Sequence, residues 1–264
     1  MTENIKAINM PKWGMEMSEG DVTAWHHRLI SENVDAVAAP PRFKATGGLD
    51  IIGMRGLEQP YYGIPNMLGE AVREQRGMRV HAWRGIGSGY NKFASESFID
   101  EIALAKGIDP LDYRLELTKD KPRANAIIKA VADMADWKRK RANGRGLGIA
   151  FSDYHGTVTA GGAEVSVDKT SGKITVHDFW IAADPGLIVH PDSSHAQLES
   201  GVVYGISAVL KEKLTIANGS VQESNFHDYE VLRMEDVPEI HTKMVETDNP
   251  PTGMGEVGIP SAAA

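Results

Sequence analysis

An alternating pattern interrupted by a turn restricts the fold of this chain more than any other feature. Residues 163–167 and 173–177 alternate apolar and polar side chains, as strands with one buried face do. The segment that joins them, Asp168-Lys169-Thr170-Ser171-Gly172, is typical of a β-hairpin turn. Further strands are predicted at 147–152 and 240–245. The chain therefore contains an antiparallel sheet.

Helix signals surround these strands. Asp109-Pro110 is a strong helix start, because Asp caps the first turn and Pro is favoured at its first position. Residues 124–135 place apolar side chains on one helical face. A further helix after Pro191 carries a stripe made of Leu198, Val202, Ile206 and Val209. Gly201 and Gly205 lie beside that stripe, so another backbone is expected to pack closely against this helix.

These elements predict an α+β fold with mixed sheets and packed helices. The flexible sequence Asn143-Gly144-Arg145-Gly146 is the candidate boundary between two parts. Residues 22–146 are expected to form an α/β part whose first stretch, to about residue 80, wraps over the rest of the molecule. Residues 147–264 are expected to form a β-rich part with one long helix. Residues 1–21 are interpreted as an appended segment.

Composition excludes several classes of protein. A net charge of −8 and the lack of a long Lys/Arg run argue against nucleic-acid binding. The chain has no Cys, which excludes disulfides, thiolate zinc sites and cysteine-ligated iron–sulfur clusters within it. No apolar run reaches the roughly 18 residues of a membrane span, and the first residues lack the pattern of a signal peptide. A cytoplasmic location is the default expectation.

A glycine-rich stretch is the first candidate for function. Residues 78–83 alternate as a strand would, and Arg84-Gly85-Ile86-Gly87-Ser88-Gly89 precedes a helical pattern that stops at Gly107. A loop between strand and helix presents backbone N–H groups and the positive end of a helix dipole to an anion. Arg84 adds a fork of donors for a phosphate or an oxo group. The spacing does not fit a dinucleotide-binding fingerprint, and a tight packing turn is the alternative.

A lone carboxylate near the end of the chain is the second candidate. Glu256 stands in the otherwise uncharged stretch Gly253-Met254-Gly255-Glu256-Val257-Gly258. Glycine lets the backbone approach another group closely, so the carboxylate can face a cavity and serve as a general base. The alternative is a turn with Glu256 exposed. By contrast, the basic cluster 138–141 is interpreted as a solvated helix end, and His190 and His195 lack the partners of a metal site.

Residues 5–26 resemble the first strands of a lipoyl domain. Such domains carry their modified lysine in an Asp-Lys-Ala turn, and no such turn follows here. A carrier function of the lipoyl type is therefore the least favoured hypothesis.

From about Val22 onward the chain resembles the C-terminal part of the molybdenum-binding large (β) subunit of the xanthine dehydrogenase family, in the branch of isoquinoline 1-oxidoreductase. Its motifs follow the order of that family. They are Trp83-Arg84-Gly85-Ile86-Gly87 with the helix to Glu101, Ala183-Asp184-Pro185-Gly186 through Gly201, Ser224-Asn225-Phe226-His227-Asp228-Tyr229 through Ile240, and Gly255-Glu256.

The resemblance implies that Glu256 is the catalytic base of an oxidoreductase that hydroxylates a carbon with oxygen derived from water. It also implies that Arg84, Gly85, Gly87 and Gly255 lie near the cofactor. That cofactor would be a molybdenum–pterin of the molybdopterin cytosine dinucleotide type, held by its dithiolene, so the lack of Cys is compatible with it. The substrate class would be an N-heterocycle or an aldehyde. Relatives also imply a small [2Fe-2S] subunit as partner and allow a periplasmic location.

The chain departs from the family in two motifs. The Gly-Gly-x-Phe-Gly and Met-Gly-Gln-Gly loops, which grip the pterin and the metal's oxo ligand, are absent. We therefore expect a fragment or split subunit of a molybdenum hydroxylase that binds cofactor together with a chain carrying the missing loops. The alternative is a truncated, non-catalytic remnant or assembly module.

Overall fold

The computed structural model describes residues 22–245 and 247–264. The prediction of an appended segment at 1–21, and most of the lipoyl-like stretch 5–26, lie outside the described residues.

A four-stranded mixed sheet forms the centre of the molecule. It consists of β3 (Arg145–Tyr154), β4 (Thr157–Val167), β5 (Ile174–Asp184) and β8 (Glu239–Met244), in that order. The first three strands are antiparallel, and β8 runs parallel to β5 along the edge. The predicted hairpin turn is confirmed, because the N–H of Asp168 donates to the carbonyl of Lys173 at 2.9 Å. The predicted α+β class with mixed sheets and packed helices is therefore confirmed.

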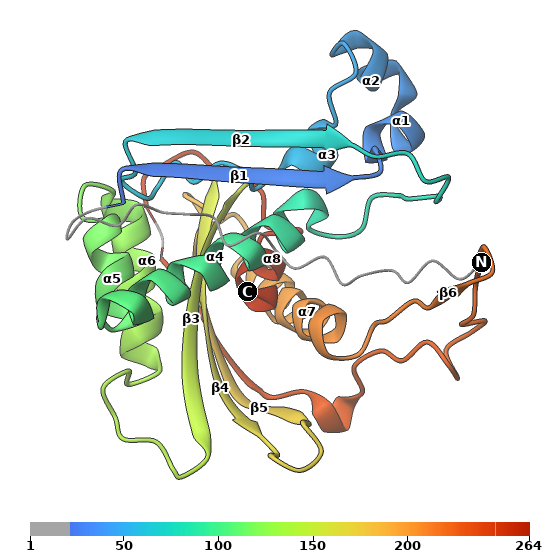
Figure 1. Ribbon diagram of the computed structural model, residues 1–264. Helices are drawn as coiled ribbons and strands as arrows, with labels where there is room; N and C mark the ends of the chain where they lie inside the picture. The colour runs from blue at the N-terminus through green and yellow to red at the C-terminus, as the bar shows by residue number, and fades with distance from the viewer. Residues whose placement is uncertain (1–21, 246) are drawn as a thin grey trace.

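Helices cover both faces of this sheet (Figure 1). The helix α6 (Pro122–Met134) packs on one face, while α7 (Pro191–Leu210) and α8 (Gly258–Ala263) pack on the other. The pleat of β5 explains the division, since successive side chains of a strand point to opposite faces. Trp180 belongs to the apolar cluster with the α6 residues, whereas Phe179 and Ile181 belong to the cluster with the α7 residues.

The expected close approach at α7 is confirmed. A Cβ added to Gly201 would lie 3.0 Å from the Cα of Gly258, and one added to Gly205 would lie 2.8 Å from the Cβ of Ala262. The two glycines therefore let α8 lie directly against α7.

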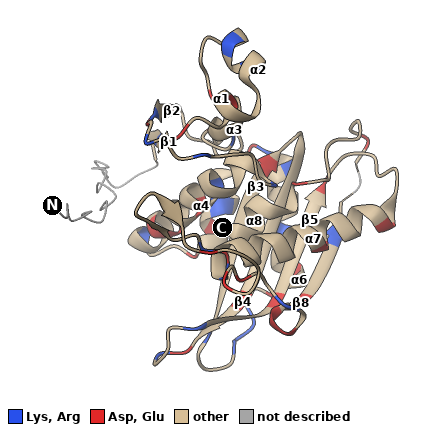
Figure 2. Ribbon diagram, turned by 90° about the vertical axis from the view of Figure 1, so that its right-hand side faces the viewer, with Lys and Arg blue, Asp and Glu red and all other residues tan. Residues whose placement is uncertain are grey.

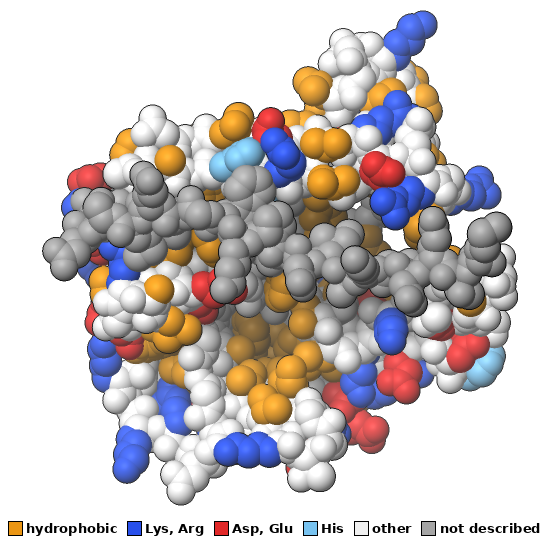
Figure 3. Space-filling view, in the orientation of Figure 1, with side chains coloured by type: hydrophobic (Ala, Val, Ile, Leu, Met, Phe, Trp, Pro, Cys, Tyr) orange, Lys and Arg blue, Asp and Glu red, His pale blue; other side chains and the backbone are white. Residues whose placement is uncertain are grey.

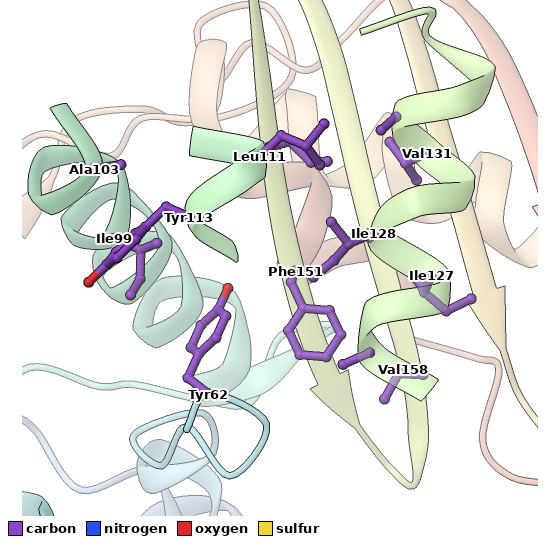
Figure 4. Packing of buried hydrophobic residues seen from close by; sticks show 14 of the residues in the cluster. Tyr62, Ile99, Ala103, Leu111, Tyr113, Ile127, Ile128, Val131, Phe151 and Val158 are labelled. Atoms are coloured by element: carbon purple, nitrogen blue, oxygen red, sulfur yellow. The ribbon is translucent and has the colours of Figure 1, made fainter. Parts of the chain in front are cut away.

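The larger apolar cluster joins α4 (Ile86–Lys106), α5 (Pro110–Leu117) and α6 to the sheet. Figure 4 shows the ring of Tyr62 beside that of Phe151 of β3, with Ile127 and Ile128 of α6 close by. Residues on both sides of 143–146 thus contribute to one core. The domain boundary expected at that point stays a prediction.

The N-terminal part consists of a separate parallel pair and short helices. The strands β1 (Ala24–Ser31) and β2 (Asn66–Arg73) pair in parallel, and Figure 1 shows them lying side by side across one end of the molecule. Between them run α1 (Val34–Ala38), α2 (Pro40–Ala45) and α3 (Ile51–Met54). The remaining elements are the small hairpin of β6 (Ile216–Ala217) and β7 (Ser220–Val221), and the 3₁₀ turn η1 (Met234–Asp236).

Three expectations about local structure were wrong. Residues 78–83 form no strand, and α4 begins at Ile86, so Gly87 and Gly89 lie inside the helix rather than in a loop. The basic cluster 138–141 is not wholly solvated. The side chain of Arg141 is only 9% exposed, and its Nε lies 3.0 Å from the carboxylate of the buried Glu164.

Figure 2 shows acidic and basic residues interspersed over the described elements. Among these elements, no helix combines the length and the hydrophobicity that crossing a membrane would require. Figure 3 shows hydrophobic side chains gathered in a hollow in the middle of one face.

Candidate active site

Two distant segments of the chain meet at Glu256. The N–H of Gly85 donates to Oε2 of Glu256 at 2.7 Å. The Nε of Arg84 donates to the carbonyl oxygen of Gly255 at 2.8 Å. Four of the five predicted site residues are therefore brought together, although the sequence separates the two pairs by 171 positions.

Two observations favour glycine at position 85. It caps α4 with a φ of 92°, a left-handed conformation that glycine adopts at little cost. A Cβ added to it would also lie 3.2 Å from the side chain of Ile259. The carboxylate of Glu256 thus reaches the positive end of a 21-residue helix, where a negative charge is stabilised.

Arg84 fastens the site to α7. One of its terminal nitrogens donates to Oγ of Ser200 and the other to Oε1 of Gln197, both at 2.7 Å. Its guanidinium carbon lies 5.1 Å from the centre of the Tyr204 ring. All three nitrogens of the side chain bind protein atoms, so in this arrangement Arg84 positions Gly255 and Glu256.

Gly87 does not face the carboxylate. A Cβ added to it would lie 2.3 Å from the carbonyl oxygen of Gly53 and 2.6 Å from that of Ile52. Its role in this structure is to let α4 pack against α3. The tight-packing alternative therefore describes Gly87, and the carboxylate of the chain itself occupies the anion position at Gly85.

Hydroxyl groups of β4 hold the segment that carries Glu256. Thr157 donates to the carbonyl of Gly253 at 2.6 Å and shares a hydrogen bond with Thr252 at 2.7 Å. Thr159 donates to the carbonyl of Val257 at 3.1 Å. The carboxylate is therefore flanked on both sides by backbone that is fixed to the sheet.

The second carboxylate oxygen of Glu256 faces a histidine that the sequence did not reveal. The Nε2 of His155 lies 3.8 Å from Oε1, and the side chain of Glu256 is 34% exposed. His155 has a φ of 52°, a conformation that is uncommon for residues other than glycine. A single His before Gly156 in a turn carries no motif, so only the fold brings it to Glu256.

Tyr154 lies beside the same carboxylate. Burial, and after it the negative charge of Glu256, raise the pKa of Tyr154 to about 12. The phenol is therefore protonated across the physiological pH range.

A small cavity opens next to this site. Its volume is about 200 Å³, and residues from the turn after β5, from the start of α7 and from the segment before Glu256 line it. They include Leu187, Val189, Gln197, Pro251 and Met254. Gln197 connects the cavity to Arg84. A second cavity of about 630 Å³ lies between α7 and residues 232–240.

The two histidines considered for a metal have structural contacts. His190 caps α7 by accepting from the N–H of Ser193 at 3.2 Å. His195 shares a hydrogen bond of 2.6 Å with Thr242. Neither belongs to a group of potential metal ligands in the described part of the chain.

Comparison with known proteins gives a consistent set of relatives. Residues 128–238 match the molybdopterin cofactor-binding domain family. The chain is 39% identical over 201 residues to the beta subunit of isoquinoline 1-oxidoreductase from Brevundimonas diminuta, a match that covers 75% of this chain and 26% of that relative. It is 34% identical over 206 residues to a nicotinate dehydrogenase subunit from Pseudomonas putida, covering 71% of this chain and 17% of the relative. The chain thus spans about a quarter, or less, of the length of these relatives.

A solved structure shares the fold. Quinoline 2-oxidoreductase from Pseudomonas putida 86 superposes with a TM-score of 0.74 at 15% identity, over 91% of this chain and 56% of that one. At this identity the similarity shows the fold alone.

Proposed function

Because this chain is a region of the molybdenum-binding subunit of the xanthine dehydrogenase family, we propose that it forms part of a molybdenum hydroxylase in which Glu256 is the general base. The observation that supports the proposal is the fixed position of that carboxylate. Oε2 is held by the N–H of Gly85, and the partly exposed side chain leaves Oε1 able to accept a proton. A general base needs this combination of fixed orientation and an accessible lone pair.

The described residues fit one wall of a molybdenum–pterin site. A Cβ added to Gly255 meets nothing within 4 Å, so a bulky group can approach the backbone next to Glu256. The nitrogens of Arg84 are all bound to protein atoms, so we expect the pterin to be gripped by loops outside this chain. When bound, the cofactor supplies the two-electron redox chemistry of the reaction.

The chain's own residues have separate tasks in this proposal. Glu256 takes the proton at Oε1 when water-derived oxygen attacks the substrate. Gly85 keeps the carboxylate directed and stabilises its charge. Arg84 holds Gly255 and α7 together, so that Glu256 and the wall of the cavity of about 200 Å³ keep one geometry.

The finer features of the proposal concern cofactor and partners. We propose a cofactor of the molybdopterin cytosine dinucleotide type, bound only with a chain that carries the missing pterin loops. A small [2Fe-2S] subunit would accept the electrons. The substrate would be an N-heterocycle, as the names of the two relatives suggest, or an aldehyde.

Coexpression with a chain carrying the missing loops tests the proposal. We expect molybdenum in the purified complex and none in this chain purified alone. The variant Glu256→Gln should retain the metal and lose at least a hundredfold in turnover, in line with the contribution of a general base. Glu235→Gln, which changes an exposed Glu of η1, is the matched control and should retain turnover. A complex without metal, or Glu256→Gln with full turnover, would contradict the proposal.

A non-catalytic assembly module is the second candidate. It is favoured by the observation that all three side-chain nitrogens of Arg84 bind protein atoms, because these contacts hold the site together without any ligand. In that case the partner chain would bind, the complex would lack molybdenum, and Glu256→Gln would change only stability.

A further inference from the structure

The edge of the central sheet brings three potential metal ligands together, away from Glu256. In the parallel register of β5 and β8, Asp178 lies opposite Glu239, and Trp180 lies opposite His241. Because side chains two positions apart on a strand share a face, all four side chains project from the same face of the sheet. The position of each is therefore fixed by strands and not by a loop.

The spacing of the donor atoms suits a tetrahedral cation. One donor atom from each of Asp178, Glu239 and His241 lies within 4.8 Å of the others. Nε2 of His241 is 3.2 Å from Oδ1 of Asp178 and 4.0 Å from Oε1 of Glu239. Zinc bonds of about 2.0–2.2 Å to N and O place tetrahedral ligands roughly 3.3–3.6 Å apart. Only Glu239, which is 76% exposed, has to move, and it is free to change rotamer.

The ring of His241 is oriented for this task. It stacks on Trp180 with the ring centres 5.6 Å apart and an angle of 12° between the planes. This contact holds the imidazole ring nearly parallel to the indole, with Nε2 directed to the carboxylate of Asp178. A ligand fixed by its surroundings loses less entropy when it binds a metal.

The cluster itself carries two carboxylates, whose charge a bound cation would neutralise. Two carboxylates directly opposite each other on neighbouring strands repel. The nearby guanidinium groups of Arg139, Arg141 and Arg145 bind Glu164 instead. In the part of the chain that the structure describes, the ion pairs of Asp178 and Glu239 are made with His241.

We propose that Asp178, Glu239 and His241 form a binding site for a divalent cation of the zinc type. One imidazole and two carboxylates leave a fourth position for water. The bound ion would tie the edge strand β8 to β5. It would thereby fix the start of the segment that runs from Val245, whose N–H donates to Ala183 at 2.8 Å, to Glu256. The site does not depend on the proposed hydroxylase function.

Calorimetric titration of the tag-free full chain with zinc chloride tests the site. We expect one equivalent of Zn²⁺ to bind, and at least a tenfold loss of affinity in His241→Gln and in Asp178→Asn. His227→Gln is the matched control, since it removes another His beside an Asp and should leave binding unchanged. No binding by the unmodified chain, or equal affinity in His241→Gln, overturns the proposal.

Trp180 provides a second readout that does not rely on a loss of binding. Co²⁺ bound at His241 should quench the fluorescence of the stacked Trp180, and Trp180→Phe should remove that quenching while calorimetry still finds one equivalent. Circular dichroism of each variant shows whether it is folded. Quenching that persists unchanged in Trp180→Phe would place the ion elsewhere and would also overturn the proposal.

Discussion

Asp184 shows how one buried carboxylate shapes the wall of the cavity beside Glu256. Burial pushes the pKa of Asp184 upward, but hydrogen bonds from Arg123, from the N–H of Gly186 and from Thr247 outweigh it and hold that pKa below its usual value. Arg123 Nε lies 2.6 Å from Oδ2. The turn after β5 is therefore built around a charge that must remain ionised.

Replacement of Asp184 by Asn should cost stability in a pH-dependent way. A carboxylate whose pKa is lowered by folding stabilises the protein above its unfolded pKa of about 3.9, and this stabilisation is lost as the pH falls through the folded pKa. We expect Asp184→Asn to lower the free energy of unfolding by about 1.5–3 kcal/mol at pH 7. Urea titrations should show the difference shrinking below about pH 4.

The exposed Asp120 supplies the control for this experiment. Asp120→Asn should behave like the unmodified chain at every pH. A stability difference for Asp184→Asn that does not change between neutral and acidic pH would contradict the role given to its charge.

At the level of single residues, the sequence predicted part of the candidate site. Glu256 could be singled out because a lone carboxylate among glycines is unusual in composition. The structure brings Arg84 next to Glu256, but its guanidinium binds Ser200 and Gln197, which lie on a helix more than a hundred positions later. Its expected position near the cofactor stays a prediction. His155 could not be predicted, because its only signal is its distance from Glu256 in space.

The N-cap and the first turn of α4 contain three glycines, each required or tolerated for a different reason. Gly85 needs a positive φ. Gly87 needs room, because a Cβ would lie 2.3 Å from the carbonyl oxygen of Gly53. Gly89 meets nothing within 4 Å. The Gly-x-Gly-x-Gly spacing does not reveal which of these reasons applies to which glycine. The sequence therefore predicted a glycine-rich loop where the structure has a helix.

Alanine substitutions at two of these positions should have opposite effects. Gly89→Ala should raise the free energy of unfolding by up to about 1 kcal/mol, because Ala is the better helix former. Gly87→Ala should lower it by about 1–3 kcal/mol, because the new methyl group forces α3 and α4 apart. Chemical denaturation of both variants checks the signs. A neutral or stabilising Gly87→Ala would show that α3 does not pack as described.

Strand prediction failed at 78–83 for a related reason. Alternating apolar and polar residues indicate that one side of a segment is apolar. A strand also needs a neighbouring backbone with which to form hydrogen bonds. β1 and β2 pair with each other over Ala24–Ser31 and Asn66–Arg73, and residues 78–83 pair with no strand among the described residues. The hairpin at 168–172 was predictable because its partner is local.

The whole molecule is held together by a buried polar network as well as by apolar packing. Glu96 is 1% exposed and accepts hydrogen bonds from Tyr62, from Arg114 and from the N–H of Phe151, at 2.7, 2.9 and 2.9 Å. These partners come from the loop before β2, from α5 and from β3. The network therefore spans the expected boundary at 143–146.

We expect residues 22–146 and 147–264 to unfold in one cooperative transition. Hydrogen exchange followed by peptide should give the same free energy of opening for core amides of α6 and of β4. Glu96→Gln should lower both values together by about 3–5 kcal/mol, because it leaves the guanidinium of Arg114 buried without its ion pair at Nε.

Glu101→Gln is the control and should change neither free energy of opening. Glu101 lies at an exposed position of α4, the helix that also carries Glu96. If Glu96→Gln lowered the stability of only one part, the chain would consist of two domains with the boundary that the sequence suggested.

The hydrogen bond between Gly85 and Glu256 also has a consequence for the timing of folding. Its partners are 171 positions apart, and contacts of such long range form late because closing a long loop costs entropy. At synthesis rates of about 5–20 residues per second, roughly 10–35 s separate the appearance of the two residues on the ribosome. During that interval α4 and the β3–β4 hairpin can form from local contacts, while the capping N–H of Gly85 faces water. The arrangement around Glu256 is thus among the last features that a newly made chain acquires.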